Sequence, residues 1–386
     1  MRKLGILAVL VLATTFLLVL AAGPAASGNG TPSTTVVMTG LNNPRGLAFG
    51  PGGWLYVAEA GSGGTGACLM IRGTSQCVGA TGSVSRWKQG RTQQRVATGL
   101  PSYAPQVSPP PDGATGPHDI GFDDGKGWIT IGLGGDPAVI RAAFGNGFGR
   151  LAKLRKNGAW SLSTDIAAHE VAANPDRGPI DSNPYGLLVG DDKKFVAEAG
   201  GNALLKIRNG TVSTVAAFAS RPQGRRTDSV PTAVIKGPGK SLLVAELTGG
   251  PFFPGEANIW RVERNGTATP YLTGFTTIID IDWSCDKRHL YVLQIASGMF
   301  MAPPPVLLKV DPRTNTRTPI AGAELTQPTS VLVDCRHQDD DEGGFRFADD
   351  DDDDDDDRGG KPHRDVLYVS NKGTLPAVGE VLRLVR

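Results

Sequence analysis

The stretch Asn42–Gly61, NNPRGLAFGPGGWLYVAEAG, decides the fold. An apolar run at Gly46–Phe49 is followed by a Pro-Gly-Gly turn, a second apolar run at Trp54–Ala58, and then Glu59. Runs of four or five apolar residues around a Gly-rich turn are typical of a β-hairpin rather than a helix. The sequence therefore predicts a hairpin whose second strand ends in a carboxylate.

The same pattern returns five more times along the 386 residues, for example as NPYGLLVGDDKKFVAEAGG from Asn183. The last copy, QPTSVLVDC, resumes after a long insert at DVLYVSNKG. A repeat of this length indicates that one supersecondary unit is stacked several times. The copies begin at Pro44, Pro117, Pro184, Pro231, Ile278 and Pro328.

Most copies are followed by two further strand-like segments, such as NALLKIRNG and then TVSTVAAF. Four strands per unit in six units is the signature of a six-bladed β-propeller. The 52 Gly and 28 Pro residues agree with many short strands and turns. We therefore predict an all-β, six-bladed propeller of the NHL or gluconolactonase type.

The two ends of the chain complete each other in this prediction. The sixth unit ends after GEVLRLVR with only three strands, whereas STTVVMTG, from Ser33, is a strand without a blade of its own. Pairing residues 34–38 with 380–385 would close the ring and remove two exposed sheet edges. We expect the N-terminal strand to lie in the last blade.

The N-terminus has the pattern of a secretory signal peptide. Arg2 and Lys3 precede an apolar run, and small residues follow around Ala26. We assign residues 1–26 to a signal peptide and residues 27–386 to the propeller, which predicts a protein exported to the periplasm, the cell surface or the medium. The alternative is an uncleaved segment that anchors the protein in a membrane.

Four cysteines fit an oxidising compartment. Cys68 and Cys77 lie in one loop, while Cys285 and Cys335 each follow the first strand of neighbouring blades. We expect the two disulfides Cys68–Cys77 and Cys285–Cys335. A zinc site is the weaker interpretation, because the chain has no CxxC pair and no nearby His pair.

The formal net charge of +1 hides an uneven distribution. Residues 339–357 hold thirteen acids and one base, so the rest of the chain is basic. A segment this acidic cannot bury apolar area, and we expect residues 337–364 to be a disordered, solvated spacer within blade six. Loose cation binding or contact with the basic body is the alternative. No nucleic-acid partner is expected.

The sequence resembles the ScyD/ScyE family of secreted propeller proteins, which are associated in cyanobacteria with making the pigment scytonemin. The matching stretches run in order along most of the chain: GLNNPRGLAFGPGGWLYVAEAG, TGPHDIGF, TIGLGGDPAV, DSNPYGLL, VAELTGGPFFPG and GFTTIIDI. The resemblance implies a propeller fold and export. The acidic insert and the pair Cys285 and Cys335 depart from the family's pattern.

Propeller geometry brings the start of each first strand and the end of each second strand to one face of the disc. Glu59, Glu198 and Glu246 end second strands in three blades, which predicts a polar axial mouth. The candidate ligand-binding residues there are Arg45, Glu59, His118, Asp119, Asn183, Tyr185, Glu198, Thr232, Glu246 and Asp280.

Three interpretations of this mouth stay open. Carboxylates that converge could bind Ca²⁺, with Glu59, Glu198 and Glu246 as ligands, and propeller lactonases are built in this way. The same carboxylates could instead cap strand ends, or contact a ligand without metal. His118 is the only His at such a position, and a lone His is more often structural than catalytic.

Loops on the same face carry apolar residues that either line a small-molecule site or pack against one another. They are Leu69, Met70, Phe144, Phe148, Phe252, Phe253, Met299, Phe300 and Met301. The Gly-rich stretches GLGGD and GSGGTG are not expected to open a helix, so no phosphate site is predicted there.

The sequence thus predicts an exported propeller that binds a small molecule or assists secondary-metabolite biosynthesis of the scytonemin type. A Ca²⁺-dependent hydrolase at the axial mouth and a platform for a protein partner are the alternatives. Whether the protein is an enzyme stays open at this level, because function resides in sites grafted on a fold.

Overall fold

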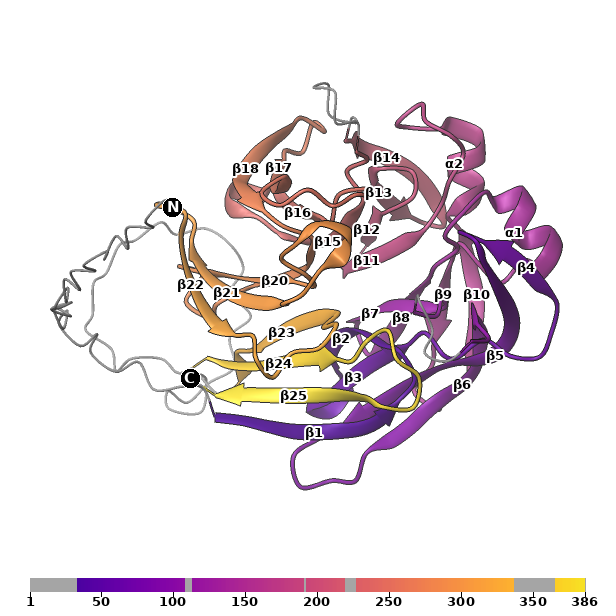
Figure 1. Cartoon of the computed structure of the whole chain (residues 1–386), viewed down its shortest axis with the longest axis horizontal. Coiled ribbons are helices and arrows are strands. Elements are labelled where there is room, and N and C mark those ends of the chain that lie inside the picture. The colour runs from indigo at the N-terminus through magenta and orange to yellow at the C-terminus, as the bar shows by residue number, and fades with distance from the viewer. Residues whose placement is uncertain (1–32, 108–112, 191, 219–226, 337–364, 386) are drawn as a thin grey trace, which may run out of the picture. The chain divides into compact units, whose positions relative to one another are not determined.

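The computed structural model describes residues 33–385 except 108–112, 191, 219–226 and 337–364. In this part of the chain the strands form six antiparallel sheets, the blades, around one axis (Figure 1). Blade 1 holds β2 (Pro44–Gly50), β3 (Trp54–Glu59), β5 (Thr74–Trp87) and β6 (Gln94–Pro105), with β4 (Cys68–Ile71) beside β5. Blade 2 holds β7 (Pro117–Asp123), β8 (Lys126–Ile131), β9 (Arg150–Leu154) and β10 (Trp160–Asp165). Blade 3 holds β11 (Pro184–Val189), β12 (Lys193–Glu198), β13 (Ala203–Arg208) and β14 (Thr211–Ala217).

The other three blades repeat this order. Blade 4 holds β15 (Pro231–Lys236), β16 (Leu242–Glu246), β17 (Ala257–Val262) and β18 (Ala268–Phe275). Blade 5 holds β19 (Ile278–Trp283), β20 (Leu290–Gln294), β21 (Val306–Asp311) and β22 (Thr316–Ala321). Blade 6 holds β23 (Ser330–Asp334), β24 (Val366–Asn371), β25 (Gly379–Val385) and β1 (Ser33–Leu41). The predicted six-bladed propeller is confirmed.

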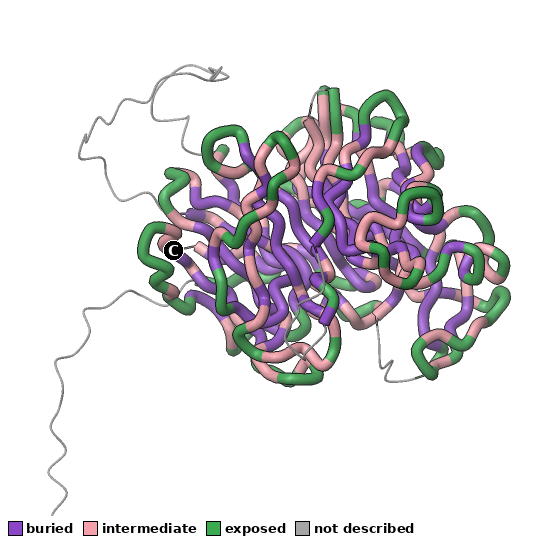
Figure 2. Tube along the Cα trace, turned by 90° about the horizontal axis from the view of Figure 1, so that it is seen from above, coloured by how far each residue is buried: buried purple, intermediate pink, exposed green. Residues whose placement is uncertain are grey.

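The hydrophobic core lies between neighbouring blades. The first strands contact one another in a closed ring, in the order β2, β7, β11, β15, β19, β23 and back to β2. Tyr291 and Leu293 of blade 5, for example, pack in one cluster with Val331 and Val369 of blade 6. Figure 2 shows the buried residues inside and the exposed residues at the turns. Each sheet therefore buries both faces, as the apolar runs in the sequence require.

The ring is closed by pairing β1 with β25, as predicted. Thr34 lies opposite Leu384, Val36 opposite Leu382 and Met38 opposite Val381. The strand leads directly into β2, so the first residues of the described chain complete blade 6 and the next ones begin blade 1. Pairing with β1 covers the edge of β25 and leaves β1 as the outer strand of blade 6.

Both predicted disulfides are present. Cys68 of β4 bonds to Cys77 of β5, with a Cα–Cα distance of 4.0 Å. Cys285 bonds to Cys335 at a Cα–Cα distance of 5.3 Å and ties blade 5 to blade 6. The described residues contain no free cysteine. Two disulfides indicate an oxidising, extracytoplasmic environment.

The structure adds two helices where the sequence pattern indicates only loops. They are α1 (Pro137–Phe144) and α2 (Ala167–Ala173). The stretch GLGGD does precede a helix, because the Asp136 side chain accepts the Ala138 N–H at 2.8 Å and caps α1. An Asp followed by Pro at the first helical position is the signal that the prediction overlooked.

The proposed signal peptide, residues 1–26, and the acidic insert, residues 337–364, lie outside the described residues. Within the described part of the chain, we find no helix with the length and apolar character needed to cross a membrane.

The closing strand provides a test of the ring. Met38 is 1% exposed, whereas Val36, two residues away, is 50% exposed. Met38→Ala is expected to lower the free energy of unfolding by about 2–5 kcal/mol, the usual cost of emptying a buried site. Val36→Ala is expected to change it by less than about 0.5 kcal/mol. Urea denaturation of both variants measures the difference, and equal losses would contradict the role of β1 in the core.

Candidate functional site at the axial face

The glutamates that end second strands are buried and fully engaged inside their own blades. Glu59 is 0% exposed and accepts hydrogen bonds from the Asn42 N–H at 2.8 Å and the Ser85 hydroxyl at 2.6 Å. It also forms an ion pair with Arg95 at 2.8 Å. These partners come from the segment before β2 and from the third and fourth strands of blade 1. Glu59 therefore joins the strands of its own blade.

Glu198 and Glu246 have the same role in blades 3 and 4. Glu198 accepts the Ser182 hydroxyl at 2.8 Å, together with the backbone N–H groups of Asn183 and Gly201. Burial raises the pKa of Glu198 to about 8. Glu246 accepts the Ser229 hydroxyl at 2.7 Å and the Trp260 indole N–H at 2.8 Å.

Three blades carry a residue other than Glu at the end of the second strand, and their contacts show the role of this position. Gln294 accepts the Thr276 N–H and Asn371 accepts the Thr326 N–H, in both cases from the segment that leads into the blade's first strand. In blade 2 the position is Gly132, and a Cβ there would lie 2.1 Å from Cε1 of His118. The imidazole fills this space instead. In the other five blades the side chain at this position holds the incoming chain.

The metal prediction is not supported by this arrangement. The described residues contain no group of three or more His, Cys, Asp or Glu side chains that could hold a metal ion. Glu59, Glu198 and Glu246 lie in three blades, and each is engaged by donors of its own blade. The capping interpretation accounts for all three, because buried carboxylates require such donors.

A second set of predicted site residues joins each blade to the next. At two blade boundaries a Thr hydroxyl near the start of one inner strand donates to the first carbonyl of the next inner strand. The predicted Thr232 donates to Ile278 O at 2.9 Å, and Thr329, which was not predicted, donates to Pro44 O at 2.7 Å. Asn183, also predicted, accepts the Leu133 N–H through Oδ1 at 3.1 Å and links blade 3 to blade 2.

Asp119 and Asp280 form equivalent links one residue further along. Asp119 accepts the Leu187 N–H of blade 3 at 2.6 Å, and Asp280 accepts the Val331 N–H of blade 6 at 2.9 Å. Burial, with Asp280 nearby, raises the pKa of Asp119 well above its usual range. Burial raises the pKa of Asp280 to about 7. A Cβ on Gly46 would lie 1.9 Å from Asp119 Oδ1, so only glycine lets this carboxylate fit between blades 1 and 2.

Arg45, His118 and Tyr185 meet near the axis, and we call them the axial cluster. Arg45 is 7% exposed and donates through Nη2 to Ala114 O at 3.0 Å. Tyr185 lies beside Arg45, and the Tyr185 ring centroid lies 4.7 Å from that of His118. Arg45 Nε is buried and has no hydrogen-bond partner among the described residues.

The electrostatics of the axial cluster keep His118 neutral. Burial, and then the positive charge of Arg45, lower the pKa of His118 to about 3. Its Nδ1–H donates to the Pro184 carbonyl at 3.1 Å, because a carbonyl oxygen can only accept. Nε2 is then an acceptor with no hydrogen bond among the described residues. The cluster thus combines a buried cationic N–H that has no hydrogen-bond partner among the described residues with a neutral imidazole.

One buried acid at this face was missed by the sequence analysis. Glu170 of α2 is 3% exposed, and its Oε1 has no hydrogen-bond partner among the described residues. Burial, with Asp176 and Asp181 nearby, raises the pKa of Glu170 to about 7. Recognising α2 from its Ala-rich AAHEVAA sequence would have placed Glu170 on a helix.

The apolar loop residues divide between the two expected roles. Phe148 is fully buried and packs against Tyr103 and Phe144 in the core. Met70 and Phe300 are 65% and 76% exposed. The loops therefore cover part of the disc and leave a few apolar side chains at the surface.

Comparisons with known proteins do not identify a family. Neither a protein-family model nor a curated protein matches the chain. Similar solved structures include a nidogen/laminin complex, with a TM-score of 0.36, 11% identity, and coverage of 60% of this chain and 74% of that chain. They also include a "putative 6-phosphogluconolactonase" from Bacteroides uniformis, with a TM-score of 0.43, 11% identity, and coverage of 91% and 90%. Neither likeness says what this chain binds or does.

Substitution of a capping glutamate should change stability. Glu246→Gln places an amide N–H₂ among hydroxyl, indole and backbone donors, and should lower the free energy of unfolding by about 1–3 kcal/mol. Glu324→Gln, at an exposed side chain, should stay within about 0.5 kcal/mol. Chemical denaturation checks this, and an unchanged Glu246→Gln protein would contradict the capping role.

The raised pKa of Asp280 predicts a pH dependence of stability. A carboxyl whose pKa is higher in the folded state binds more protons when folded, so its stabilisation is complete below the unfolded pKa of 3.8 and is lost as pH rises toward about 7. Asp280→Asn should flatten the decline of unfolding free energy between pH 4 and 7, by at most about 1.4 kcal/mol per pH unit. Denaturation curves at several pH values test this, and parallel declines in both proteins would refute it.

Proposed function

We propose that this propeller binds a small molecule bearing an anionic oxygen at the axial cluster. The observation that carries the proposal is the buried Nε of Arg45, a cationic donor without a hydrogen-bond partner among the described residues. An unsatisfied buried donor costs free energy that an acceptor on a ligand would recover. Guanidinium groups suit carboxylates and other oxyanions in both charge and geometry.

The aromatic rings of His118 and Tyr185, which lie beside Arg45, indicate which other chemical groups the ligand would carry. The rings of His118 and Tyr185 pack against each other beside the guanidinium, with 4.7 Å between their centroids. His118 Nε2 is available as an acceptor for a ligand hydroxyl. A planar aromatic molecule with one carboxylate and one hydroxyl group would use all three side chains.

Binding is favoured over acid–base catalysis by the state of His118. With a pKa of about 3 this imidazole is a poor general base near neutral pH. A Ca²⁺-dependent hydrolase has no observation in its favour, since the described carboxylates form no group that could hold a metal ion. The proposed role is therefore that of a binding protein.

The resemblance to the ScyD/ScyE family supports a proposal about the pathway in which this binding protein acts. On that proposal the protein is exported through its N-terminal segment and assists secondary-metabolite biosynthesis of the scytonemin type. Its two disulfides agree with an oxidising compartment. The support for the pathway is the quoted sequence stretches alone.

Calorimetric titration with 4-hydroxybenzoate tests the proposal. The native protein is expected to bind it, and Arg45→Gln to weaken binding by about 10- to 100-fold, the value of a hydrogen bond to a charged group. The uncharged analogue 4-hydroxybenzamide is the matched control, and it should bind weakly to both proteins. The unfolding transition of Arg45→Gln without ligand verifies that it is folded. Absence of binding to the native protein, or equal affinity in both, would overturn the proposal.

A further inference from the structure

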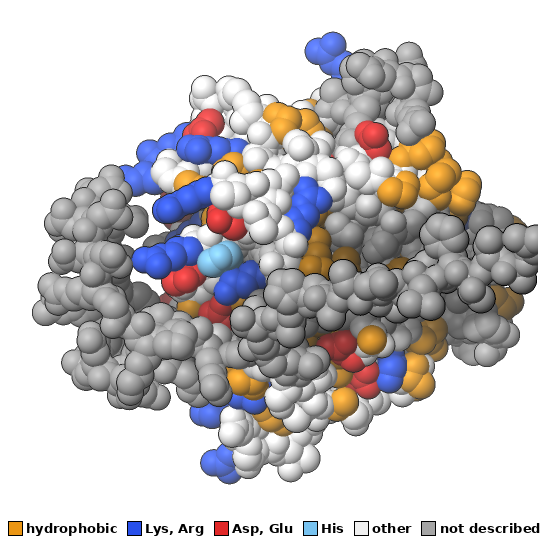
Figure 3. Space-filling model, turned by 60° about the vertical axis from the view of Figure 1, so that its left-hand side comes forward, with side chains coloured by type: hydrophobic (Ala, Val, Ile, Leu, Met, Phe, Trp, Pro, Cys, Tyr) orange, Lys and Arg blue, Asp and Glu red, His pale blue; other side chains and the backbone are white. Residues whose placement is uncertain are grey.

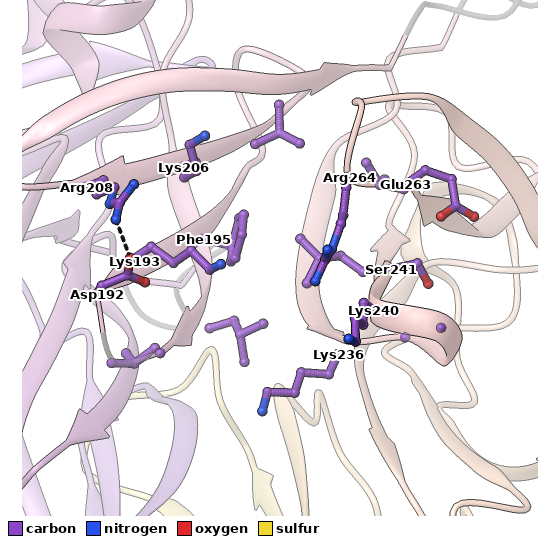
Figure 4. Close-up of a pocket in the computed structure, with 18 residues that line it drawn as sticks. Asp192, Lys193, Phe195, Lys206, Arg208, Lys236, Lys240, Ser241, Glu263 and Arg264 are labelled. Carbon is purple, nitrogen blue, oxygen red and sulfur yellow. Dashed lines mark ion pairs between the residues drawn. The ribbon is translucent and has the colours of Figure 1, made fainter. Parts of the chain in front are cut away.

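A basic groove lies between blades 3 and 4 (Figure 4). The turns between first and second strands that form it lie on the face opposite the axial cluster. Its walls are the turns between the first and second strands of these blades and the ends of their third strands. It encloses about 1250 Å³. The basic groove is lined by six basic side chains: Lys193, Lys206, Arg208, Lys236, Lys240 and Arg264.

The charge of the basic groove is largely unbalanced. Its two acids are already paired, Asp192 with Arg208 at 2.8 Å and Glu263 with Arg261 at 2.7 Å. Among the described residues the other five bases of the groove have no carboxylate within ion-pair distance. In the view of Figure 3, Asp and Glu side chains lie among the Lys and Arg side chains. The groove therefore fits an anionic occupant.

The size and floor of the groove indicate a chain rather than a single small anion. Between the basic walls lie apolar side chains that include Phe195, Val215 and Leu242. A phosphate or a carboxylate would leave this apolar surface and most of the volume unused. An acidic peptide that also carries large apolar side chains matches both features.

We propose that the basic groove binds residues 339–357 of the same chain. This sequence, DDDEGGFRFADDDDDDDDD, places Phe345 and Phe347 between two acidic runs. Its thirteen acids complement the bases of the groove, and its two phenylalanines complement the apolar floor. The sequence alone favours a solvated spacer, but the groove provides a partner of the right charge and chemistry.

The topology brings this segment to the correct face. It leaves the propeller after β23 and returns before β24, at the turn between the first and second strands of blade 6. The same turns of blades 3 and 4 form the groove. Twelve extended residues reach about 40 Å, and the groove begins at the inner strands β11 and β15, next to the axis. Tethering makes the contact intramolecular and raises the effective concentration of the segment to about millimolar.

Titration of a fluorescent peptide of residues 339–357 into the full-length protein tests the proposal. The native chain already supplies an occupant, so a chain with Asp349–Asp357 replaced by Asn should bind the peptide at least about 10-fold more tightly. Adding Lys193→Glu and Lys236→Glu to that chain should weaken binding by at least about 10-fold. Adding Arg155→Glu and Lys156→Glu, in an exposed turn of blade 2 on the same face, is the matched control and should change it less than about twofold.

The outcomes separate this proposal from its alternatives. Equal affinity of the native and Asn-substituted chains, or no effect of the two groove substitutions, would overturn it. An equal loss from the blade 2 substitutions would reduce it to general charge attraction. Light scattering that shows a concentration-dependent dimer of the native chain, lost in the Asn-substituted chain, would place the segment in a second copy and refute the intramolecular contact. Circular dichroism of each variant establishes that it is folded.

Discussion

Pairing between β1 and β25 is the interaction on which the rest of the structure depends. Six twisted sheets can surround an axis only if the last blade contacts the first, and blade 6 has only three strands of its own. Because β1 runs directly into β2, the strand that completes blade 6 also holds it against blade 1. Two hydroxyl groups strengthen this seam, since Thr329 and Ser370 donate to the carbonyls of Pro44 and Arg45 at 2.7 Å. The seam satisfies buried backbone groups that an open ring would leave unpaired.

The same requirement explains most of the buried polar side chains near the axis. Inner strands of different blades do not form a continuous hydrogen-bonded sheet, so some of their backbone groups must find side-chain partners. Asp119, Thr232 and Asp280 provide such partners across three blade boundaries. A carboxylate buried at a propeller axis is therefore not evidence of a metal site by itself. What distinguishes the axial cluster is an unsatisfied atom, Arg45 Nε, rather than burial alone.

The two faces of the disc differ in their electrostatics. Near the axial cluster, acids with raised pKa values and a neutral His leave Arg45 as the main charged group, so the proposed ligand would be selected by hydrogen-bond geometry and by this one positive charge. The basic groove on the other face has unpaired surface charge, which attracts anions from a distance and weakens with salt. The two proposed sites therefore differ in the physical basis of binding as well as in position.

The sequence by itself determined the number of blades, the closing strand and both disulfides, because these follow from local and repeated patterns. A strand pair around a Gly-rich turn, repeated six times, specifies the same unit wherever it stands in the chain. It also indicated that Glu59, Glu198 and Glu246 share one structural position. The contacts of each glutamate were decided only by the tertiary structure, since hydroxyl and amide donors reach each carboxylate from other strands of its blade.

The helices α1 and α2 were not predicted because they are only eight and seven residues long and lie in loops between strands. The basic groove escaped prediction for a different reason. Its basic residues are far apart in the sequence, in or near four turns of two blades: KK, RNG, KGPGK and ERNG. Only the tertiary structure packs these four turns side by side and so forms one charged surface.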